Sequence, residues 1–367
     1  MVKAFSKIFG FAINFAYLFF KLKKTENKIT FISRQSDIPS LDFRCLINEI
    51  KENYPQYRVD VLCKMIPSGL TGKISYIFEM LRQMKSLASS RVAVIDGYCI
   101  PVCMLKHKSD LTVVQIWHAL GAVKKFGWQS VGTKEGRSES ISRAMCMHRN
   151  YDYVLAPSKK TAEFYSEGFD IALGRIKVLP LPRVDFILDN NNREEEFYSL
   201  NPQMKNKKIV LYLPTFRSGE AMAADLLKKQ FVNKKEYRLI FSTHPLSEVK
   251  KDEGFTAKGN FSSYDLMKLA DIIITDYSAC AFEAALLLKP LYFFIPDYES
   301  YMQDRGINVD VKKEFPSAAF ENAELLADAI KKDNYDMNSL EAFKEKYVEN
   351  ADTNSTKNLV KFILKQM

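Results

Sequence analysis

The sequence lacks the short motifs from which most nucleotide and metal sites are built. No G-x-G-x-x-G and no G-x-x-x-x-G-K-[ST] occurs among the 367 residues, which excludes the usual dinucleotide fingerprint and the P-loop. There is also no H-E-x-x-H, no C-x-x-C and no pair of aspartates two residues apart, so no metal-ligand cluster of familiar spacing is present. We therefore expect no metal site and no required cofactor. Side chains and helix N-termini are expected to stabilise any anionic substrate.

Cysteine is scarce and the charge is unbalanced. The six cysteines form no C-x-x-C pair and several lie within apolar runs, which is typical of reduced thiols in a cytosolic protein. With 53 Lys and Arg against 44 Asp and Glu, the formal net charge is +9, which indicates an anionic partner such as phosphate, acidic lipid or nucleic acid. No motif that reads DNA or RNA accompanies this charge, so we expect no nucleic-acid partner.

The N-terminal segment is apolar but short. Residues 4–20, as a helix, span only about 25 Å, less than the roughly 30 Å hydrocarbon core of a bilayer. Polar residues recur at helical spacing, and an apolar face lies opposite them: Phe5, Ile8, Phe9, Ala12, Phe15 and Phe19. No small-residue cleavage site follows, so we expect no secretory signal. Residues 1–24 are predicted to form an amphipathic helix at an anionic membrane surface. Packing on the protein's own core is the alternative, and a membrane span is the least favoured.

The rest of the chain alternates short apolar runs with helical patterns, which predicts parallel sheets covered by helices on both faces. The predicted strands are 28–33, 57–62, 92–96, 111–115, 153–156, 176–179, 209–213, 238–242, 272–275 and 291–295. A polar stretch at 189–208 is the predicted linker. We therefore predict an α/β protein with two doubly wound, Rossmann-like domains facing a cleft, at 28–188 and 206–345. A C-terminal helix is predicted within 346–367.

Two of the four histidines follow predicted strands, one in each half. His118 follows the apolar run 111–115, and His244 likewise follows an apolar run. Open α/β sheets place their ligands at the carboxyl ends of the strands. Imidazole is the side chain best suited to move a proton near neutral pH, so we predict that both residues are catalytic. His107, expected in a solvated loop, and His148, expected at a helix end, are predicted to have no catalytic part.

The C-terminal half has a polar turn between a predicted strand and a predicted helix. Asp276, Tyr277 and Ser278 follow the strand at 272–275, and Glu283 lies in the helix that follows. With Ser278 as its N-cap, this helix would direct free N–H groups at the strand end, which suits a diphosphate. An ordinary capped helix without a ligand has the same pattern.

Basic residues follow strands and glycines elsewhere. Arg217, in Pro214-Thr215-Phe216-Arg217, comes after a predicted strand, and Arg305 precedes Gly306. Guanidinium groups pair naturally with phosphate oxygens. After His118 comes a basic, glycine-containing loop, which on charge alone is typical of a solvated face. It contains Gly121, Lys124, Lys125 and Gly127.

Taken together, these segments resemble the CDP-glycerol glycerophosphotransferases, which build wall teichoic acids and related polyol-phosphate polymers. The resemblance begins with Gln115-Ile116-Trp117-His118-Ala119 and Lys124-Lys125-Phe126-Gly127. In the family's order it continues with Leu181-Pro182-Arg183, Asp185, Pro214-Thr215-Phe216-Arg217, His244-Pro245, 271–278, Lys289-Pro290, Tyr298, Tyr301 and Arg305-Gly306. It covers residues 28–316, and its specificity lies in the ordered set.

The resemblance implies a GT-B-like architecture, with the acceptor in the N-terminal domain and a CDP-alcohol in the C-terminal domain. The implied reaction moves glycerol phosphate from CDP-glycerol to a hydroxyl of a lipid-linked diphosphate saccharide and releases CMP. His118 is then the general base, and His244 stabilises charge on the transferred phosphoryl group. The implied donor-binding residues are Thr215, Arg217, Thr243, Asp276, Tyr277, Ser278, Glu283 and Arg305. Those on the acceptor side are Gln115, Gly121 and Lys125.

This reading implies a peripheral enzyme on the cytoplasmic face of a bacterial cell membrane, and it is compatible with an oligomer. The chain length favours a primase or short-product transferase. Two positions depart from the family pattern: Thr243 stands where a basic residue is common, and Ala279 where a second serine is common. Both leave CDP-ribitol open as the donor. A GT-B glycosyltransferase using a nucleotide sugar, and a non-catalytic module that binds anionic polymer at a membrane, are the remaining alternatives.

Overall fold

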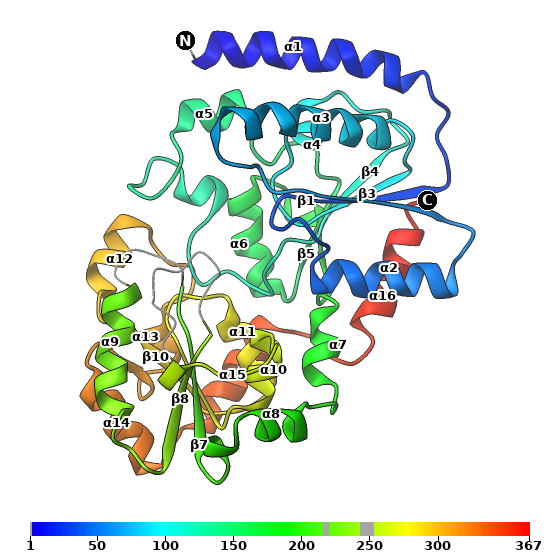
Figure 1. Cartoon of the computed structure of the whole chain (residues 1–367). Coiled ribbons are helices and arrows are strands. Elements are labelled where there is room, and N and C mark those ends of the chain that lie inside the picture. Colours follow the sequence, from blue (N-terminus) through cyan, green and yellow to red (C-terminus); the bar gives the residue numbers. More distant parts are fainter. Residues whose placement is uncertain (1, 216–219, 243–252) are drawn as a thin grey trace. The chain divides into compact units, whose positions relative to one another are not determined.

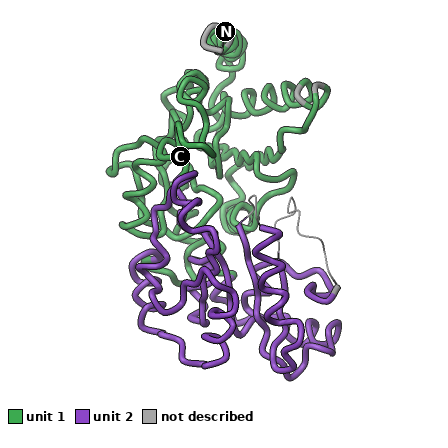
Figure 2. Tube along the Cα trace, turned by 90° about the vertical axis from the view of Figure 1, so that its left-hand side faces the viewer, with its two compact units in different colours: residues 1–120, 126–186, 349–367 green, residues 121–125, 187–348 purple. Residues whose placement is uncertain are grey.

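The computed structural model describes residues 2–215, 220–242 and 253–367. The chain divides into two compact units, coloured separately in Figure 2. Unit 1 comprises residues 1–120, 126–186 and 349–367, and unit 2 comprises residues 121–125 and 187–348. Each unit contains one parallel sheet with helices around it, so the predicted fold class of two Rossmann-like domains is confirmed.

Unit 1 is built on a six-stranded parallel sheet in the order β2-β1-β3-β4-β5-β6. The strands are β1 (Lys28–Ser33), β2 (Arg58–Cys63), β3 (Val92–Ile95), β4 (Thr112–Gln115), β5 (Tyr153–Ala156) and β6 (Ile176–Val178). The helices are α1 (Val2–Lys21), α2 (Leu41–Asn53), α3 (Gly69–Leu87), α4 (Ile100–Met104), α5 (Glu139–Ala144), α6 (Lys159–Phe169), α7 (Arg183–Leu188) and α16 (Ser355–Leu364). Figure 1 shows α3 on one side of the sheet, with α2 and α16 on the other.

Burial on both faces explains why the strands of unit 1 were predictable. Every residue of β1 and β3 is buried, because helices cover both sides of a doubly wound sheet. Side-chain oxygens begin the helices that follow: Ser40 accepts the N–H of Phe43 at α2, and Ser158 accepts the N–H of Thr161 at α6. Six predicted strands in this half correspond to the six observed, within one or two residues.

Unit 2 has a five-stranded parallel sheet in the order β11-β10-β9-β7-β8. The strands are β7 (Lys208–Leu213), β8 (Tyr237–Phe241), β9 (Ile272–Thr275), β10 (Leu291–Phe294) and β11 (Ala319–Phe320). The helices are α8 (Glu194–Leu200), α9 (Glu220–Phe231), α10 (Ser263–Leu269), α11 (Cys280–Leu286), α12 (Tyr298–Asp304), α13 (Val311–Glu314), α14 (Ala323–Lys332) and α15 (Met337–Tyr347). The edge strand β11 was not predicted, because its two residues are too short to form a pattern.

The segment predicted as a linker is structured. It holds α8, whose Phe197 is fully buried against Phe261. Arg193 pairs with Glu196 and with Asp265, which ties the start of α8 to α10. Polar composition suggested a linker here, but the one aromatic side chain on the inner face of α8 is enough to attach it to unit 2.

The boundaries of the units differ from the predicted ones in two places. Residues 121–125 belong to unit 2, because Lys124 forms an antiparallel bridge with Ile307 and the N–H of Lys125 donates to the carbonyl of Gly306. Residues 349–367 belong to unit 1, where α16 packs against α2. Asp185 accepts the N–H groups of Ser355 and Thr356 and so caps the start of α16.

Helix α1 packs on the protein's own core, which was the alternative stated for it, and its position at a membrane surface stays a prediction. Its inner face packs on unit 1 through Tyr17, which is 1% exposed and bonds to His107 at 3.1 Å. Among the residues of α1 whose burial is described, the outer face leaves large apolar side chains exposed: Ile8, Phe11, Phe15, Leu18 and Phe19, with Leu22 just beyond the helix. Within the described residues, no helix is long and apolar enough to cross a membrane. Figure 1 shows α1 next to α3 and α5, with which it is in contact.

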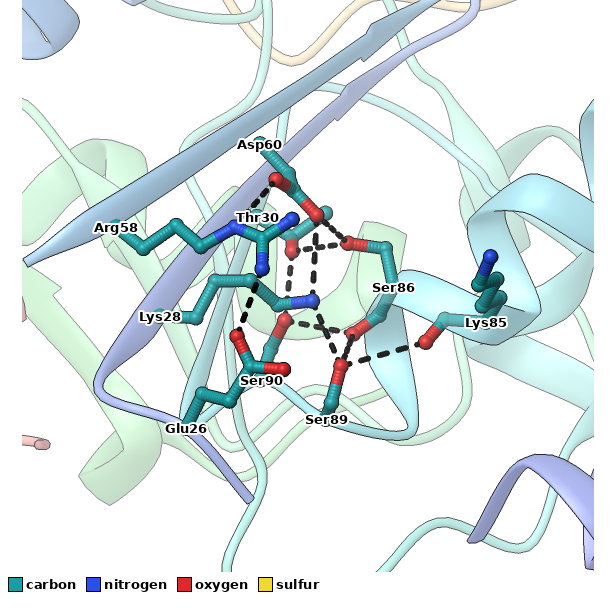
Figure 3. Close-up of polar contacts among 9 residues, drawn as sticks. All are labelled: Glu26, Lys28, Thr30, Arg58, Asp60, Lys85, Ser86, Ser89 and Ser90. Carbon is teal, nitrogen blue, oxygen red and sulfur yellow. Dashed lines mark hydrogen bonds and ion pairs between the residues drawn. The ribbon is translucent and has the colours of Figure 1, made fainter. Parts of the chain in front are cut away.

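A buried ion pair joins the amino ends of β1 and β2 to the end of α3 (Figure 3). Lys28, whose side chain is 3% exposed, lies 3.2 Å from Asp60 and donates to the hydroxyl of Ser89 at 2.7 Å. Ser86 donates to Asp60 at 2.7 Å. Burial alone would raise the pKa of Asp60, but Ser86 and Lys28 outweigh that effect and lower it. Asp60 therefore stays ionised and neutralises a charge that would otherwise be buried alone.

This pair predicts an asymmetric response to mutation. Asp60→Ala leaves the Lys28 ammonium buried without its partner, so the free energy of unfolding is expected to fall by about 3 kcal/mol. Arg58→Ala is the control, because Arg58 pairs with the same carboxylate but is 62% exposed, and its loss should cost less than about 1 kcal/mol. Urea unfolding of the two variants measures the difference. Equal losses would contradict a buried role for the pair.

Candidate active site

His118 lies at the carboxyl end of β4, beside the end of β3. The register pairs Ile95 with Gln115, which places Asp96 next to the turn that carries His118. The Nδ1 atom of His118 lies 2.9 Å from the carbonyl oxygen of Asp96 and 3.3 Å from the side-chain amide of Gln35. A carbonyl only accepts, so Nδ1 carries the proton and Nε2 is the basic nitrogen. The imidazole is exposed, and its orientation suits a proton acceptor.

The turn itself is held in an unusual backbone conformation. Trp117 has φ 62°, which is disfavoured for a bulky residue. Gln115 stabilises it by accepting the Trp117 N–H at 2.8 Å and donating to the carbonyl of Gly97 at 3.2 Å. Gln115 was predicted on the acceptor side. Its side chain is fully buried, however, and positions the loop. The Trp117 ring lies 4.0 Å from the His118 ring and packs on Phe126.

A second anchor for His118 comes from distant residues that the sequence did not single out as partners. Arg183 donates to the carbonyl oxygen of His118 at 3.1 Å. Its Nε lies 2.9 Å from Asp42, whose carboxylate also accepts the backbone N–H of Arg183 at 2.8 Å. Asp42 is 1% exposed and lies in the first turn of α2. The ring of His118 is therefore held by Asp96 and its main chain by Arg183.

Asp96 was also missed, because a single aspartate after a strand carries no motif. Its carboxyl is 2% exposed, and burial raises its pKa to about 7, while the side chain of Ser33 opposes that change. The carboxyl therefore changes charge near neutral pH on the same residue whose backbone carbonyl holds the imidazole.

The other two histidines are not where the sequence placed them. His107 is largely buried and contacts Tyr17 and the carbonyl of Val102 instead of lying in a solvated loop. His148 lies beyond α5, bonded to Tyr151, and burial lowers its pKa to about 3. It is therefore neutral and does not supply the positive charge expected at a helix end. Neither histidine has a position like that of His118.

In unit 2, the structure brings together two of the predicted donor-binding residues. Asp276 follows β9 and accepts both the backbone N–H of Thr215, at 2.8 Å, and its hydroxyl, at 2.7 Å. Both residues are buried. Asp276 therefore fixes the backbone that follows β7, at the carboxyl edge of the sheet. Arg217, Thr243 and His244 lie outside the described residues.

The turn after Asp276 differs from the prediction. Ala279, not Ser278, is the N-cap of α11, and Ser278 instead accepts the N–H of Cys280 at 3.4 Å. The ring of Tyr277 is fully buried and stacks on Tyr301 at 3.8 Å, so it supports the turn from within the core. Glu283, in the first turn of α11, is 3% exposed.

Two residues predicted on the acceptor side belong to unit 2. The side chain of Lys125 lies against Gly306, the residue that follows Arg305 at the end of α12. Gly121 lies against Phe282 so closely that an added Cβ would stand 2.5 Å from the ring. A glycine is required there by the close approach. Within the described residues, no group of three His, Cys, Asp or Glu side chains is placed to hold a metal ion.

Comparison with known proteins gives a consistent result. The profile of a family described as CDP-Glycerol:Poly(glycerophosphate) glycerophosphotransferase matches residues 14–365. The chain is 30% identical over 353 residues to the teichoic acid ribitol-phosphate primase of Bacillus spizizenii, covering 92% of this chain and 90% of that protein. It is 26% identical to the teichoic acid glycerol-phosphate primase of Bacillus subtilis, covering 94% and 93%.

A solved structure shares the fold. The wall teichoic acid polymerase TagF superposes with a TM-score of 0.72 at 19% identity, covering 99% of this chain and 96% of that one. The two parallel-sheet units are therefore of the GT-B-like type.

The buried carboxyl of Asp96 predicts a pH-dependent stability. Because its pKa is higher in the folded than in the unfolded protein, the native state binds the extra proton, and this contribution is lost as pH rises toward about 7. Asp96→Asn removes the titration. The stability of that variant relative to the unmodified protein should rise by roughly 1 kcal/mol per pH unit between pH 5 and 7. Urea unfolding at several pH values measures this, and a pH-independent difference would contradict it.

Proposed function

The chain belongs to the CDP-glycerol:poly(glycerophosphate) glycerophosphotransferase family and is a teichoic-acid glycerol- or ribitol-phosphate transferase; we propose that it transfers a polyol phosphate from a CDP-alcohol to a hydroxyl of a lipid-linked acceptor. The observation that carries this proposal is the geometry of His118. Its tautomer, its exposure and its two backbone anchors are those of a general base at the carboxyl edge of a sheet.

In the proposed step, Nε2 of His118 takes the proton of the acceptor hydroxyl as its oxygen attacks the phosphorus that bears the polyol. The new bond joins the acceptor oxygen to that phosphorus. The bond to the bridging diphosphate oxygen breaks, and CMP leaves with that oxygen. An alcohol is a weak nucleophile, so a positioned base contributes roughly 10²–10⁴-fold. The rest of the acceleration comes from positioning and from cations on the transferred group.

Unit 2 is the proposed donor side. Lys125, which lies against Gly306, and the neighbouring Arg305 are proposed to hold diphosphate oxygens, together with Arg217. Thr215 and Asp276 shape the backbone beside them, and the buried Glu283 is the proposed ribose contact. His244 would stabilise charge on the transferred phosphoryl group.

The acceptor is proposed to be a lipid-linked diphosphate saccharide at the cytoplasmic face of a bacterial membrane. The exposed apolar face of α1 supports this, because Phe11 is 76% exposed and Leu22 84% exposed at a basic end of the helix. Apolar residues flanked by lysines are typical of helices that lie in an anionic membrane interface. A priming role, with addition of one or a few units, is the proposed extent of reaction.

CDP-ribitol is the second candidate donor. The 30% identity to a ribitol-phosphate primase and the departures at Thr243 and Ala279 support it beside CDP-glycerol. Incubation with CDP-glycerol, CDP-ribitol and UDP-sugars, with a lipid-diphosphate disaccharide as acceptor, separates the candidates. We expect CMP release from a CDP-polyol and a product extended by one or a few polyol phosphates, measured by mass spectrometry. UDP release alone would identify a glycosyltransferase instead.

The role of His118 is tested by substitution. His118→Ala is expected to lower kcat by about 10²–10⁴ without loss of the fold, because the attacking hydroxyl then lacks its base. Arg183→Lys keeps the charge but loses the forked contact, and is expected to lower kcat by about tenfold with little change in KM for the donor. His107→Gln is the control and should retain turnover. Turnover by His118→Ala within twofold of the unmodified enzyme would contradict the mechanism.

A further inference from the structure

A groove lies between α1 and α5 in unit 1, and none of the residues that line it has a part in the mechanism described above. Its volume is about 980 Å³, at the upper end of the roughly 300–1,000 Å³ that ligand pockets occupy. Its lining is largely apolar, with Phe11, Phe15 and Leu18 from α1 and Met104 and Ala144 opposite them. The three α1 residues are also part of the exposed apolar face of that helix, so the groove is continuous with it.

The polar lining of this groove is basic. Its described lining residues include five with cationic side chains: Lys7, Lys21, Lys106, Arg143 and Arg149. No Asp or Glu is among these described lining residues. Arg143 has a carboxylate partner outside the groove, Glu139, at 2.8 Å. Lys7, Lys106 and Arg149 have no ion pair within the part of the chain that the structure describes. A ligand for this site therefore combines an apolar chain with an anionic group.

The wall formed by α1 is fixed to unit 1. The side-chain amide of Asn14 donates to the carbonyl of Met104 at 3.0 Å, and its oxygen accepts the N–H of Lys106 at 2.8 Å. Asn14 thus forms hydrogen bonds with the backbone on both sides of Leu105, directly after α4. Together with the buried Tyr17, these contacts fix the position of α1 on unit 1, so this wall of the groove is part of the folded unit.

Contacts within unit 1 connect the groove to His118. The carbonyl of Met145, at the end of α5, accepts the hydroxyl of Tyr98 at 2.6 Å. Tyr98 follows Asp96 and Gly97, whose carbonyls hold the His118 ring and Gln115. Arg34 and Arg137 lie 5.3 and 5.9 Å from the Tyr98 ring. Cationic side chains therefore continue from the groove toward the proposed base.

We propose that the groove binds the lipid diphosphate end of the acceptor, with its hydrocarbon chain between α1 and α5 and its diphosphate on the basic lining. This rests on the lipid-linked acceptor of the proposed function and adds a site for it. An amphipathic ligand of this kind matches both the apolar floor and the uncompensated positive charge, whereas a free sugar or nucleotide matches only part of it. The groove itself, and not only the surrounding membrane, would thus select the hydrocarbon chain of the acceptor.

The test is direct binding of geranylgeranyl diphosphate to the full-length protein, measured by calorimetry without any donor. Two changes target the groove: Ala144→Trp fills it, and the pair Lys106→Glu with Arg143→Glu reverses its charge. Lys24→Glu and Leu173→Glu are matched controls, because both residues are exposed and neither lines the groove. Circular dichroism checks that each variant is folded, and the charge variants serve if Ala144→Trp is not.

We expect both groove changes to weaken binding at least tenfold and both controls to stay within twofold of the unmodified protein. Inorganic diphosphate and geranylgeraniol, each with half of the chemistry, should bind at least tenfold more weakly, as should dioctanoyl phosphatidylglycerol. Groove variants that bind normally, or a Lys24→Glu loss equal to theirs, would overturn the proposal. Equal binding of the phospholipid would assign the groove to bulk acidic lipid. Because no donor is present, these outcomes are independent of whether a CDP-alcohol is turned over.

Discussion

The buried pair of Asp42 and Arg183 is the interaction on which the geometry of the proposed base depends. Desolvating both groups is expensive, and such a pair adds little net stability compared with apolar residues of the same size. Its effect is positional. The Nε and Nη2 atoms of Arg183 both donate to the carboxylate, and Nη2 also donates to the main-chain carbonyl of His118. A lysine could neutralise Asp42 but could not reproduce this fork.

The strained turn at Trp117 fits the same picture. A bulky residue with positive φ persists only when several contacts define it, and strain of this kind concentrates at functional sites. Here Gln115 fixes the turn from below and aromatic packing fixes it from the side. The loop therefore holds the imidazole rigidly at the sheet edge, and little conformational entropy is lost when a substrate hydroxyl approaches it.

The sequence predicted what depends on local pattern and failed where distant residues meet. Strands were found because buried parallel strands are continuous apolar runs, and His118 because it follows one. Thr215 and Asp276 meet because adjacent parallel strands end at the same edge, while the donor-binding role that the resemblance implied for them stays a prediction. The contact of Arg183 with Asp42 spans 141 residues and leaves no local signal. Ser278 was misassigned because serine bonds backbone in several ways near a helix start.

The return of the chain to unit 1 has a consequence for its biosynthesis. Helix α2 packs in part against α16, which leaves the ribosome only after the whole of unit 2 has been made. Unit 1 therefore cannot complete its folding domain by domain in the usual N-to-C order. During translation, the side of α2 that packs on α16 remains uncovered until α16 has been made. Until then, the carboxylate of Asp185 also lacks the helix start that it caps.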